Sequence, residues 1–245
     1  MDLTQLTPDE VVYGQVGFFT VNATIVFTWV VMAVMIVTSW LITRRLSSST
    51  DVPKAQNALE IVVTYLRDEI RSIGGGGGSP DPYLPFVGTL FLFIAVANLL
   101  AIVPGFLPPT ASLSTTAALA IAVFLAVPVF AIVRQGPRSF ARRYVEPTPL
   151  MLPFTVIGDV SRSFALAVRL FGNTMSSAKI VAILLLVIPF LFPILFQVLG
   201  LLLGMIQAYI FAVLAMVYIA SGMTVTDRSR SATAPHRTTT TKEKP

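Results

Sequence analysis

The sequence predicts an all-α polytopic membrane protein with about five membrane helices, the last two forming a long hairpin, plus one amphipathic helix at the membrane surface. Three observations predict this class. Of the 245 residues, 55% are hydrophobic and 12% are charged, whereas soluble domains carry about 25% charged residues. The apolar residues form five blocks, each long enough to cross a bilayer as a helix of about 20 residues. The basic residues lie almost entirely outside these blocks.

The first 17 residues are polar and acidic, and they contain no lysine or arginine. A cleavable signal peptide begins with a basic segment, so we expect residues 1–17 to remain in the protein as an extracytoplasmic N-terminus. The first apolar block, 18–42, follows and ends at Arg44 and Arg45. We expect residues 18–149 to hold three membrane helices, of which this block is the first.

The second and third blocks, 84–104 and 113–133, have the length of ordinary membrane helices. Between the first and second blocks, residues 55–73 carry apolar side chains at helical spacing with charged side chains between them. This pattern is typical of an amphipathic helix that lies along the membrane surface. Five consecutive glycines, 74–78, come next and predict a loop.

The fourth and fifth blocks, 150–187 and 190–223, are too long for ordinary membrane helices. Each would form a helix of about 50–57 Å, whereas the hydrocarbon core of a bilayer is about 30 Å thick. Each helix must therefore be broken or strongly tilted, because the usual tilt of about 20° does not absorb the excess. Pro189 and Pro193 predict a turn between the blocks. We predict a strongly tilted helical hairpin over residues 150–225.

The distribution of basic residues predicts the orientation of the chain. Of the 17 lysines and arginines, 14 lie in three segments outside the apolar blocks, 44–71, 134–143 and 228–244. With five spans these segments share one side of the membrane, and the positive-inside rule makes that side the cytoplasm. The polar tail, 226–245, is therefore expected to be cytoplasmic and disordered. This distribution explains the basic composition without a nucleic-acid partner.

Composition excludes several kinds of chemistry. The chain has no cysteine, and its single histidine, His236, lies in the polar tail. Disulfides, thiolate catalysis and a histidine metal site or proton relay within the membrane are thereby excluded. Asp159 is the only acidic residue in the five blocks, and no phosphate-binding glycine motif occurs. We expect no cofactor, no metal site, no nucleotide site and no catalytic centre in this chain.

Arg169, within the fourth block, points most strongly to a function. A charge near the bilayer centre costs roughly 2.5–3.5 kcal/mol on insertion scales, and intramembrane charges usually mark functional sites. Several polar side chains fall on or near the same helical face, because offsets of three, four and seven residues recur there. Such a stripe faces water, another protein or an ion path rather than lipid. Its candidate channel-lining residues are Asp159, Arg162, Asn173 and Ser176, with Ser177 next in sequence.

The other charged residues in this block have two interpretations each. Asp159 and Arg162 form either a local ion pair, three residues apart, or part of a conduction path. Lys179 either extends its amine to the membrane interface or serves the function. Arg169 has no comparable structural explanation, since Asp159 is too far along the helix for a direct pair.

The fifth block carries a helix-packing pattern. Gly200 and Gly204 are four residues apart, a spacing that lets helices approach closely. Gln207 continues the same face, and we expect it to form an interhelical hydrogen bond, in particular to the fourth block. Asn98, in the second block, is either a similar contact between helices or a ligand on the ion path.

These residues resemble a known family. The string Arg169-Leu-Phe-Gly-Asn173, followed by Gln207-Ala-Tyr-Ile-Phe211, is similar to subunit a of the F-type ATP synthase. Other matching positions are Asn98-Leu99, Pro104 and the segment 109–115, and the resemblance extends over residues 20–225.

The resemblance implies a mechanism and a set of partners. The hairpin would pack against a rotating ring of c subunits in a bacterial inner membrane, with the subunit b stator stalk and the rest of the complex around it. Two offset aqueous half-channels would carry H⁺ or Na⁺ to and from each ring carboxylate, and Arg169 would separate them. Nucleotide chemistry would belong to partner subunits.

The chain departs from the family pattern at three positions. Many members carry an acid nine positions after the arginine, where this chain has Ala178. Members often have His or Glu seven positions before the glutamine, where this chain has Gly200. An acid that follows Asn-Leu in some members is replaced by Ala101. Either the polar residues of the fourth block and water substitute for these groups, or the path suits Na⁺ or belongs to a divergent branch.

A different class of function also fits an apolar chain with buried charges. A self-contained ion channel or secondary transporter would usually show inverted repeats or paired broken helices. The sequence contains no internal repeat. An ion-translocating subunit of a rotary ATPase is therefore the favoured interpretation.

Overall fold

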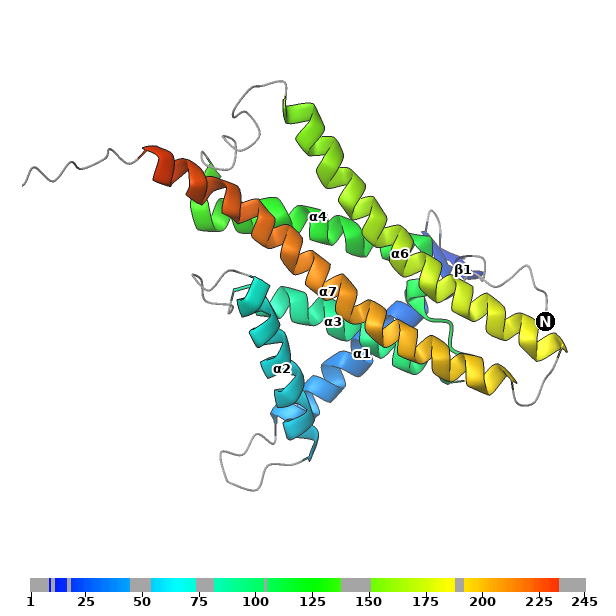
Figure 1. Ribbon diagram of the computed structural model, residues 1–245. Coiled ribbons are helices and arrows are strands. Elements are labelled where there is room, and N and C mark those ends of the chain that lie inside the picture. Colours follow the sequence, from blue (N-terminus) through cyan, green and yellow to red (C-terminus); the bar gives the residue numbers. More distant parts are fainter. Residues whose placement is uncertain are drawn as a thin grey trace, which may run out of the picture.

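The computed structural model describes residues 9, 12–16, 19–44, 54–73, 82–103, 105–137, 151–187 and 192–233. Most of these residues are helical, which confirms the all-α class (Figure 1). The elements are, in chain order, β1 (Val12–Val16), β2 (Phe19–Asn22), α1 (Ala23–Thr43), α2 (Lys54–Ile73), α3 (Leu84–Leu100), η1 (Pro109–Ala111), α4 (Leu113–Gln135), α6 (Met151–Val187) and α7 (Phe192–Thr233).

The N-terminal segment differs from the prediction. β1 and β2 form an antiparallel hairpin, in which Val16 pairs with Phe19. Helix α1 begins only at Ala23, so the first span does not start at residue 18. Both strands are short and rich in Val, Phe, Tyr and Thr, which favour extended backbone. Average hydropathy does not separate such a strand from the apolar helix that follows it.

Four helices, α3, α4, α6 and α7, enclose the hydrophobic core. Each contributes fully buried side chains, for example Ile94 on α3, Val123 on α4, Leu170 on α6 and Phe211 on α7. In Figure 1, α6 and α7 lie side by side toward the right-hand end and diverge toward the left, where α4 is visible between them, and α3 lies behind α7. Helix α1 lies at the edge of this bundle, and few of its side chains are buried.

The two long helices are unbroken. Helix α6 has 37 residues and α7 has 42, which corresponds to about 56 and 63 Å at 1.5 Å per residue. Continuous helices of this length fit a bilayer of about 30 Å only if they tilt strongly or extend beyond it. The structure therefore removes the alternative of broken helices.

Helix α7 continues further than predicted. It ends at Thr233, so residues 226–233 are helical rather than disordered. No glycine or proline interrupts the chain between Met223 and Pro235, and a helix usually stops just before a proline. Residues 234–245, with His236, lie outside the described part of the chain.

Four helices, within the described residues, are long and apolar enough to cross a membrane: α1, α4, α6 and α7. Helix α3 is apolar but shorter, with 17 residues, or about 26 Å. Helix α2 occupies the predicted amphipathic segment. It buries Leu66 and Ile70, while Ile61 remains exposed, and it contacts both α3 and α7.

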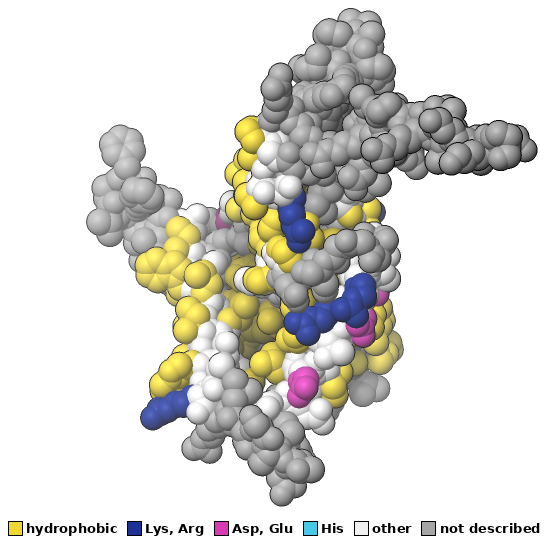
Figure 2. Space-filling model, turned by 90° about the vertical axis from the view of Figure 1, so that its left-hand side faces the viewer, with side chains coloured by type: hydrophobic (Ala, Val, Ile, Leu, Met, Phe, Trp, Pro, Cys, Tyr) yellow, Lys and Arg dark blue, Asp and Glu magenta, His cyan; other side chains and the backbone are white. Residues whose placement is uncertain are grey.

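Basic residues gather at one end of the bundle. Figure 2 looks onto the left-hand end of Figure 1, where α4 and α7 reach their C-terminal ends, and shows Lys and Arg side chains among hydrophobic ones. Arg44 directly follows α1, and Arg134 lies in the last turn of α4. The C-terminal ends of α1 and α4, where two of the basic segments begin, thus lie toward the same end of the molecule.

Candidate functional site

Arg169 lies on the outer face of α6. Its helix is held by Leu166, Ala167 and Leu170, which are buried in the core, while the Arg169 side chain is exposed. Within the described part of the chain, its guanidinium has no hydrogen bond or ion pair. The backbone of Arg169 is therefore fixed by the core, and its charge is presented outward.

Exposed apolar side chains flank the polar stripe that contains this arginine. Val168, next to it on α6, is 43% exposed, and Phe164 is 68% exposed. On α7, Leu202, Leu203 and Ile206 are exposed as well. A charged group within such a face would meet lipid unless another protein covers it, and lipid alone gives a guanidinium no counter-charge.

The contacts between α6 and α7 place Gln207 at the level of Arg169. Asn173 Nδ2 lies 3.4 Å from the carbonyl oxygen of Leu203 and donates to it. Arg169 lies four residues before Asn173, and Gln207 lies four residues after Leu203. Because α6 and α7 run antiparallel, Arg169 and Gln207 lie at the same height along the hairpin. Gln207 is buried, and its Nε2 atom has no hydrogen-bond partner among the described residues. The interhelical hydrogen bond that we expected of Gln207 is made instead by Asn173.

Asn98 joins α3 to α7. Its Nδ2 atom donates to the carbonyl oxygen of Gly204, 3.1 Å away, and lies 2.9 Å from the carbonyl oxygen of Ile94. A Cβ atom at Gly204 would lie 2.7 Å from Cγ of Asn98, closer than real Cβ contacts allow. Gly200 packs differently, because a Cβ there would lie 3.4 Å from Cβ of Ser177 on α6. Close packing of α3 against α7 therefore requires a residue without a side chain at Gly204, but not at Gly200.

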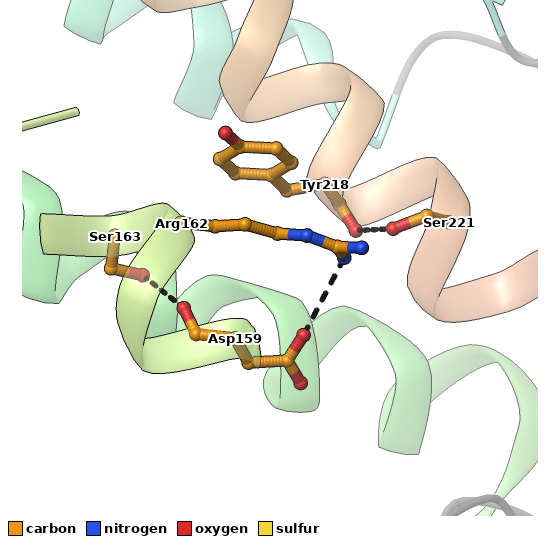
Figure 3. A network of polar contacts seen from close by, with 5 residues as sticks. All are labelled: Asp159, Arg162, Ser163, Tyr218 and Ser221. Carbon is orange, nitrogen blue, oxygen red and sulfur yellow. Dashed lines mark hydrogen bonds and ion pairs between the residues drawn. The ribbon is translucent and has the colours of Figure 1, made fainter. Parts of the chain in front are cut away.

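A mainly apolar cavity with one polar side lies between α4, α6 and α7. It has a volume of about 170 Å³. Figure 3 shows its polar side, where Arg162 extends between the ring of Tyr218 and the carboxylate of Asp159. The Arg162 Nη1 atom lies 3.6 Å from Asp159 Oδ1, and its guanidinium carbon lies 5.9 Å from the Tyr218 ring centre. Two serines, an apolar wall from α4 and one apolar residue of α6 complete the lining: Ser163, Ser221, Val123, Phe124, Val127, Pro128 and, on α6, Val156.

The remaining candidates from the sequence lie apart from this cavity. Ser176 and Lys179 are exposed on α6, and Ser177 is half-buried beside Gly200. None of the three lines the cavity. The structure therefore brings together Asp159 and Arg162 with Tyr218, and separates them from the other polar residues of the stripe.

Several polar contacts were not anticipated. Tyr209 on α7 donates to Glu69 on α2, with 3.1 Å between their oxygens. Gln197 Nε2 lies 3.0 Å from the carbonyl oxygen of Ala101. The place of Ser163 in the cavity could have been predicted, because Ser163 follows Asp159 by four residues and therefore lies on the same helical face. The pairs Tyr209–Glu69 and Gln197–Ala101 join residues about 100 positions apart or more. No local pattern in the sequence signals such pairs.

Comparison with known proteins identifies the family. A model of the ATP synthase A chain matches residues 25–220. The chain belongs to the ATP synthase A chain family. It is 56% identical over 220 residues to ATP synthase subunit a 2 of Acaryochloris marina, which covers 90% of this chain and 93% of the relative. It is also 56% identical over 217 residues to ATP synthase subunit a of Albidiferax ferrireducens, covering 89% and 93% of the two chains.

A third relative, ATP synthase subunit a 1 of Chlorobaculum parvum, is 53% identical over 226 residues, or 92% of this chain and 99% of the relative. Membership of the ATP synthase A chain family, together with the long apolar helices, makes this chain a multi-pass membrane subunit of an ATP synthase. Its place is the ion-transporting Fo sector of that complex.

Proposed function

We propose that this chain carries ions to and from the rotating ring of its ATP synthase and that Arg169 is the residue that separates the two half-channels. The exposed position of Arg169 carries this proposal. Its guanidinium is exposed between apolar side chains of α6 and α7 and has no counter-charge within the described residues. A carboxylate on a neighbouring subunit would supply that charge.

Arginine suits this role for a physical reason. Its pKa lies above about 12, so it remains charged where burial would neutralise a lysine. At 4 Å, two opposite unit charges attract by about 4 kcal/mol at an effective dielectric constant of 20. The attraction favours the ionised form of each arriving ring carboxylate and thereby the release of its H⁺ or Na⁺. The same positive charge repels cations that would pass directly between the half-channels.

The proposed arrangement includes partners and orientation. The exposed face of α6 and α7 would meet the c-subunit ring, and the subunit b stator stalk would hold this chain in place. The basic helix ends would face the cytoplasm of a bacterial cell, with the N-terminus outside the inner membrane. Candidate lining residues of the half-channels are Asn98, Asp159, Arg162, Asn173, Ser176, Ser177, Lys179 and Gln207.

The function is tested by Arg169→Ala in the assembled complex, reconstituted into vesicles. ATP-driven ion pumping should fall at least about 100-fold, because loss of about 3 kcal/mol at a rate-determining step slows it by that factor. Arg44→Ala removes the same charge at the end of α1 and should leave pumping unchanged. Equal amounts of this subunit in both complexes exclude an assembly defect. Coupled pumping at the normal rate in Arg169→Ala would refute the proposal.

A further inference from the structure

Helix α2 packs its apolar side against two helices of the bundle. Leu66 and Ile70 are only 4% and 3% exposed. Ile70 belongs to the same core cluster as Ala212 and Met216 of α7. On α3, a Cβ atom at Gly88 would lie 3.9 Å from Cδ1 of Leu66. The amphipathic helix therefore uses its apolar residues to dock between α3 and α7, and not only to lie on the membrane surface.

One polar contact joins α2 to α7. The Tyr209 hydroxyl donates to Oε1 of Glu69, 3.1 Å away, and the ring of Tyr209 lies 6.0 Å from that of Tyr65. A hydrogen bond to a carboxylate is stronger than one between neutral groups. Among the α2 side chains that the structure describes, only Leu66 and Ile70 are buried. The bond to Tyr209 is therefore a large part of what holds α2 on α7.

Tyr209 lies on the side of α7 opposite Gln207. Two residues along a helix correspond to about 200° around its axis and about 3 Å along it. One turn before Gln207, the carbonyl of Leu203 accepts a hydrogen bond from Asn173 of α6. In Figure 1, α6 lies above α7 and α2 lies below it. Helix α7 is thus held between α6 and α2 at the height of Arg169.

The position of Arg169 depends on this part of α7. Leu166 and Leu170, on either side of Arg169 along α6, are buried in one cluster with Ala208 and Phe211 of α7. A displacement of α7 therefore shifts the backbone that carries the guanidinium. The attraction between two charges falls as they separate, and a misplacement of about 1 Å can slow a reaction by about 100-fold.

We propose that Glu69 and Tyr209 are positioning residues of the ion-translocating site. Their bond makes α2 a brace that holds α7, and through α7 the Arg169 segment of α6, against the force of the rotating ring. This rests on the proposed function, because only a moving partner exerts such a force. Neither residue touches the ion. Without the brace, Arg169 yields as ring carboxylates pass, and the ring turns without transferring an ion at every step.

The test measures the number of ions transported per ATP hydrolysed by the assembled complex in vesicles. The complex is purified through a tag on this subunit, so that every complex contains it. Tyr209→Phe removes the donor and keeps the ring, and Glu69→Ala removes the acceptor. In each variant ATP hydrolysis should stay within about twofold of normal, whereas the ions per ATP should fall at least about threefold, because a small misplacement strongly weakens a charge-dependent step.

Two matched variants separate the bond from the charge of α2. Glu69→Gln keeps an acceptor oxygen and should restore most of the ions per ATP that Glu69→Ala loses. Asp68→Ala removes the same charge from an exposed neighbour on α2 and should give the normal number. A normal number in both Tyr209→Phe and Glu69→Ala, or an equal loss in Asp68→Ala, overturns the proposal.

The double variant Tyr209→Phe with Glu69→Ala tests whether the two residues act through one bond. If they do, its loss should not exceed that of either single variant, because the second change has no contact left to remove. Additive losses would mean that the residues act separately, which contradicts the brace. A subunit that merely assembles less well lowers hydrolysis and transport together and leaves the ions per ATP unchanged.

A measurement that needs no working motor keeps the two proposals distinguishable. Hydrogen exchange of the α7 amides at residues 205–211, in the purified complex, should become about fivefold faster in Tyr209→Phe than in the unmodified protein. Unchanged exchange refutes the brace and leaves the role of Arg169 intact. Normal pumping by Arg169→Ala refutes the proposed function, whatever the exchange rate.

Discussion

At the scale of single residues, the carboxylate of Asp9 ties the N-terminal segment to two helices. Its Oδ1 atom accepts a hydrogen bond from Thr24 Oγ1 on α1, 2.7 Å away, and its Oδ2 atom lies 2.6 Å from Ser112 Oγ at the start of α4. Ser114 Oγ is 3.2 Å from Oδ1. A negative charge at the N-terminal end of a helix is favourable because the first N–H groups point toward it.

We expect Asp9→Asn to weaken this connection by about 1 kcal/mol, because the neutral amide accepts fewer hydrogen bonds and loses the interaction with the helix end. Hydrogen exchange of the backbone amides at residues 116–120, in the purified complex, should become about fivefold faster. Asp2→Asn changes the net charge equally and serves as the control. Equal exchange in both variants would contradict a specific role of Asp9.

Arg169 and Asp159 show what a residue type reveals without a structure. An arginine inside an apolar block is costly, so its presence alone indicates a site. The sequence left two interpretations of Asp159 and Arg162, an ion pair or a conduction path. The structure shows the ion pair, and it adds Tyr218, Ser163 and Ser221 around it, which makes the pair one wall of a cavity.

At the scale of elements, the contact between α3 and α7 depends on a glycine. The small-residue spacing of Gly200 and Gly204 predicted close helix approach but gave both positions equal weight. In the structure only Gly204 has a neighbour inside the contact distance of a Cβ atom, namely Asn98. The difference arises because the two glycines face different helices.

Gly204→Ala should therefore destabilise the subunit by about 1–3 kcal/mol, since the added methyl group displaces Asn98 from its hydrogen bond. Gly200→Ala is the matched control and should be neutral or stabilising by up to about 1 kcal/mol, because alanine favours a helix over glycine. Thermal unfolding of this subunit in the purified complex distinguishes the two. Asn98→Ala combined with Gly204→Ala should recover part of the loss, and equal effects of the two glycine variants would refute this explanation.

At the scale of the whole molecule, the helix ends at Arg44 and Arg134 lie toward the same end of the molecule, as the positive-inside rule expects of cytoplasmic ends. The predicted orientation depends on five spans, although α3 is shorter than the other four. An odd number of spans places the two termini on opposite sides of the membrane, whereas an even number places them on the same side.

Single cysteines at the termini test this topology in a chain that has no other thiol. In sealed right-side-out vesicles, a membrane-impermeant maleimide should label Thr4→Cys and leave Thr239→Cys unlabelled. Inside-out vesicles should give the reverse, because the basic segments favour the cytoplasmic side. Labelling of both positions from one side would mean an even number of spans.

The sequence alone determined the class of protein, the long hairpin and the position of Arg169. These follow from hydropathy and charge, which act on each segment by itself, and the family resemblance rested on local strings of residues. The β1–β2 hairpin and the helical residues 226–233 were missed. The hairpin was missed because average hydropathy does not distinguish a short apolar strand from the helix that follows it. The end of α7 was missed because a polar composition does not prevent a helix from continuing.

Only the tertiary structure decided which polar side chains meet. The bond between Tyr209 and Glu69, the contact of Asn98 with Gly204 and the cavity around Asp159 each join segments that are distant in the chain. Such contacts depend on the register and rotation of packed helices. Those quantities are set by the complete core, in which side chains from α3, α4, α6 and α7 interlock, and no single segment of the sequence specifies them.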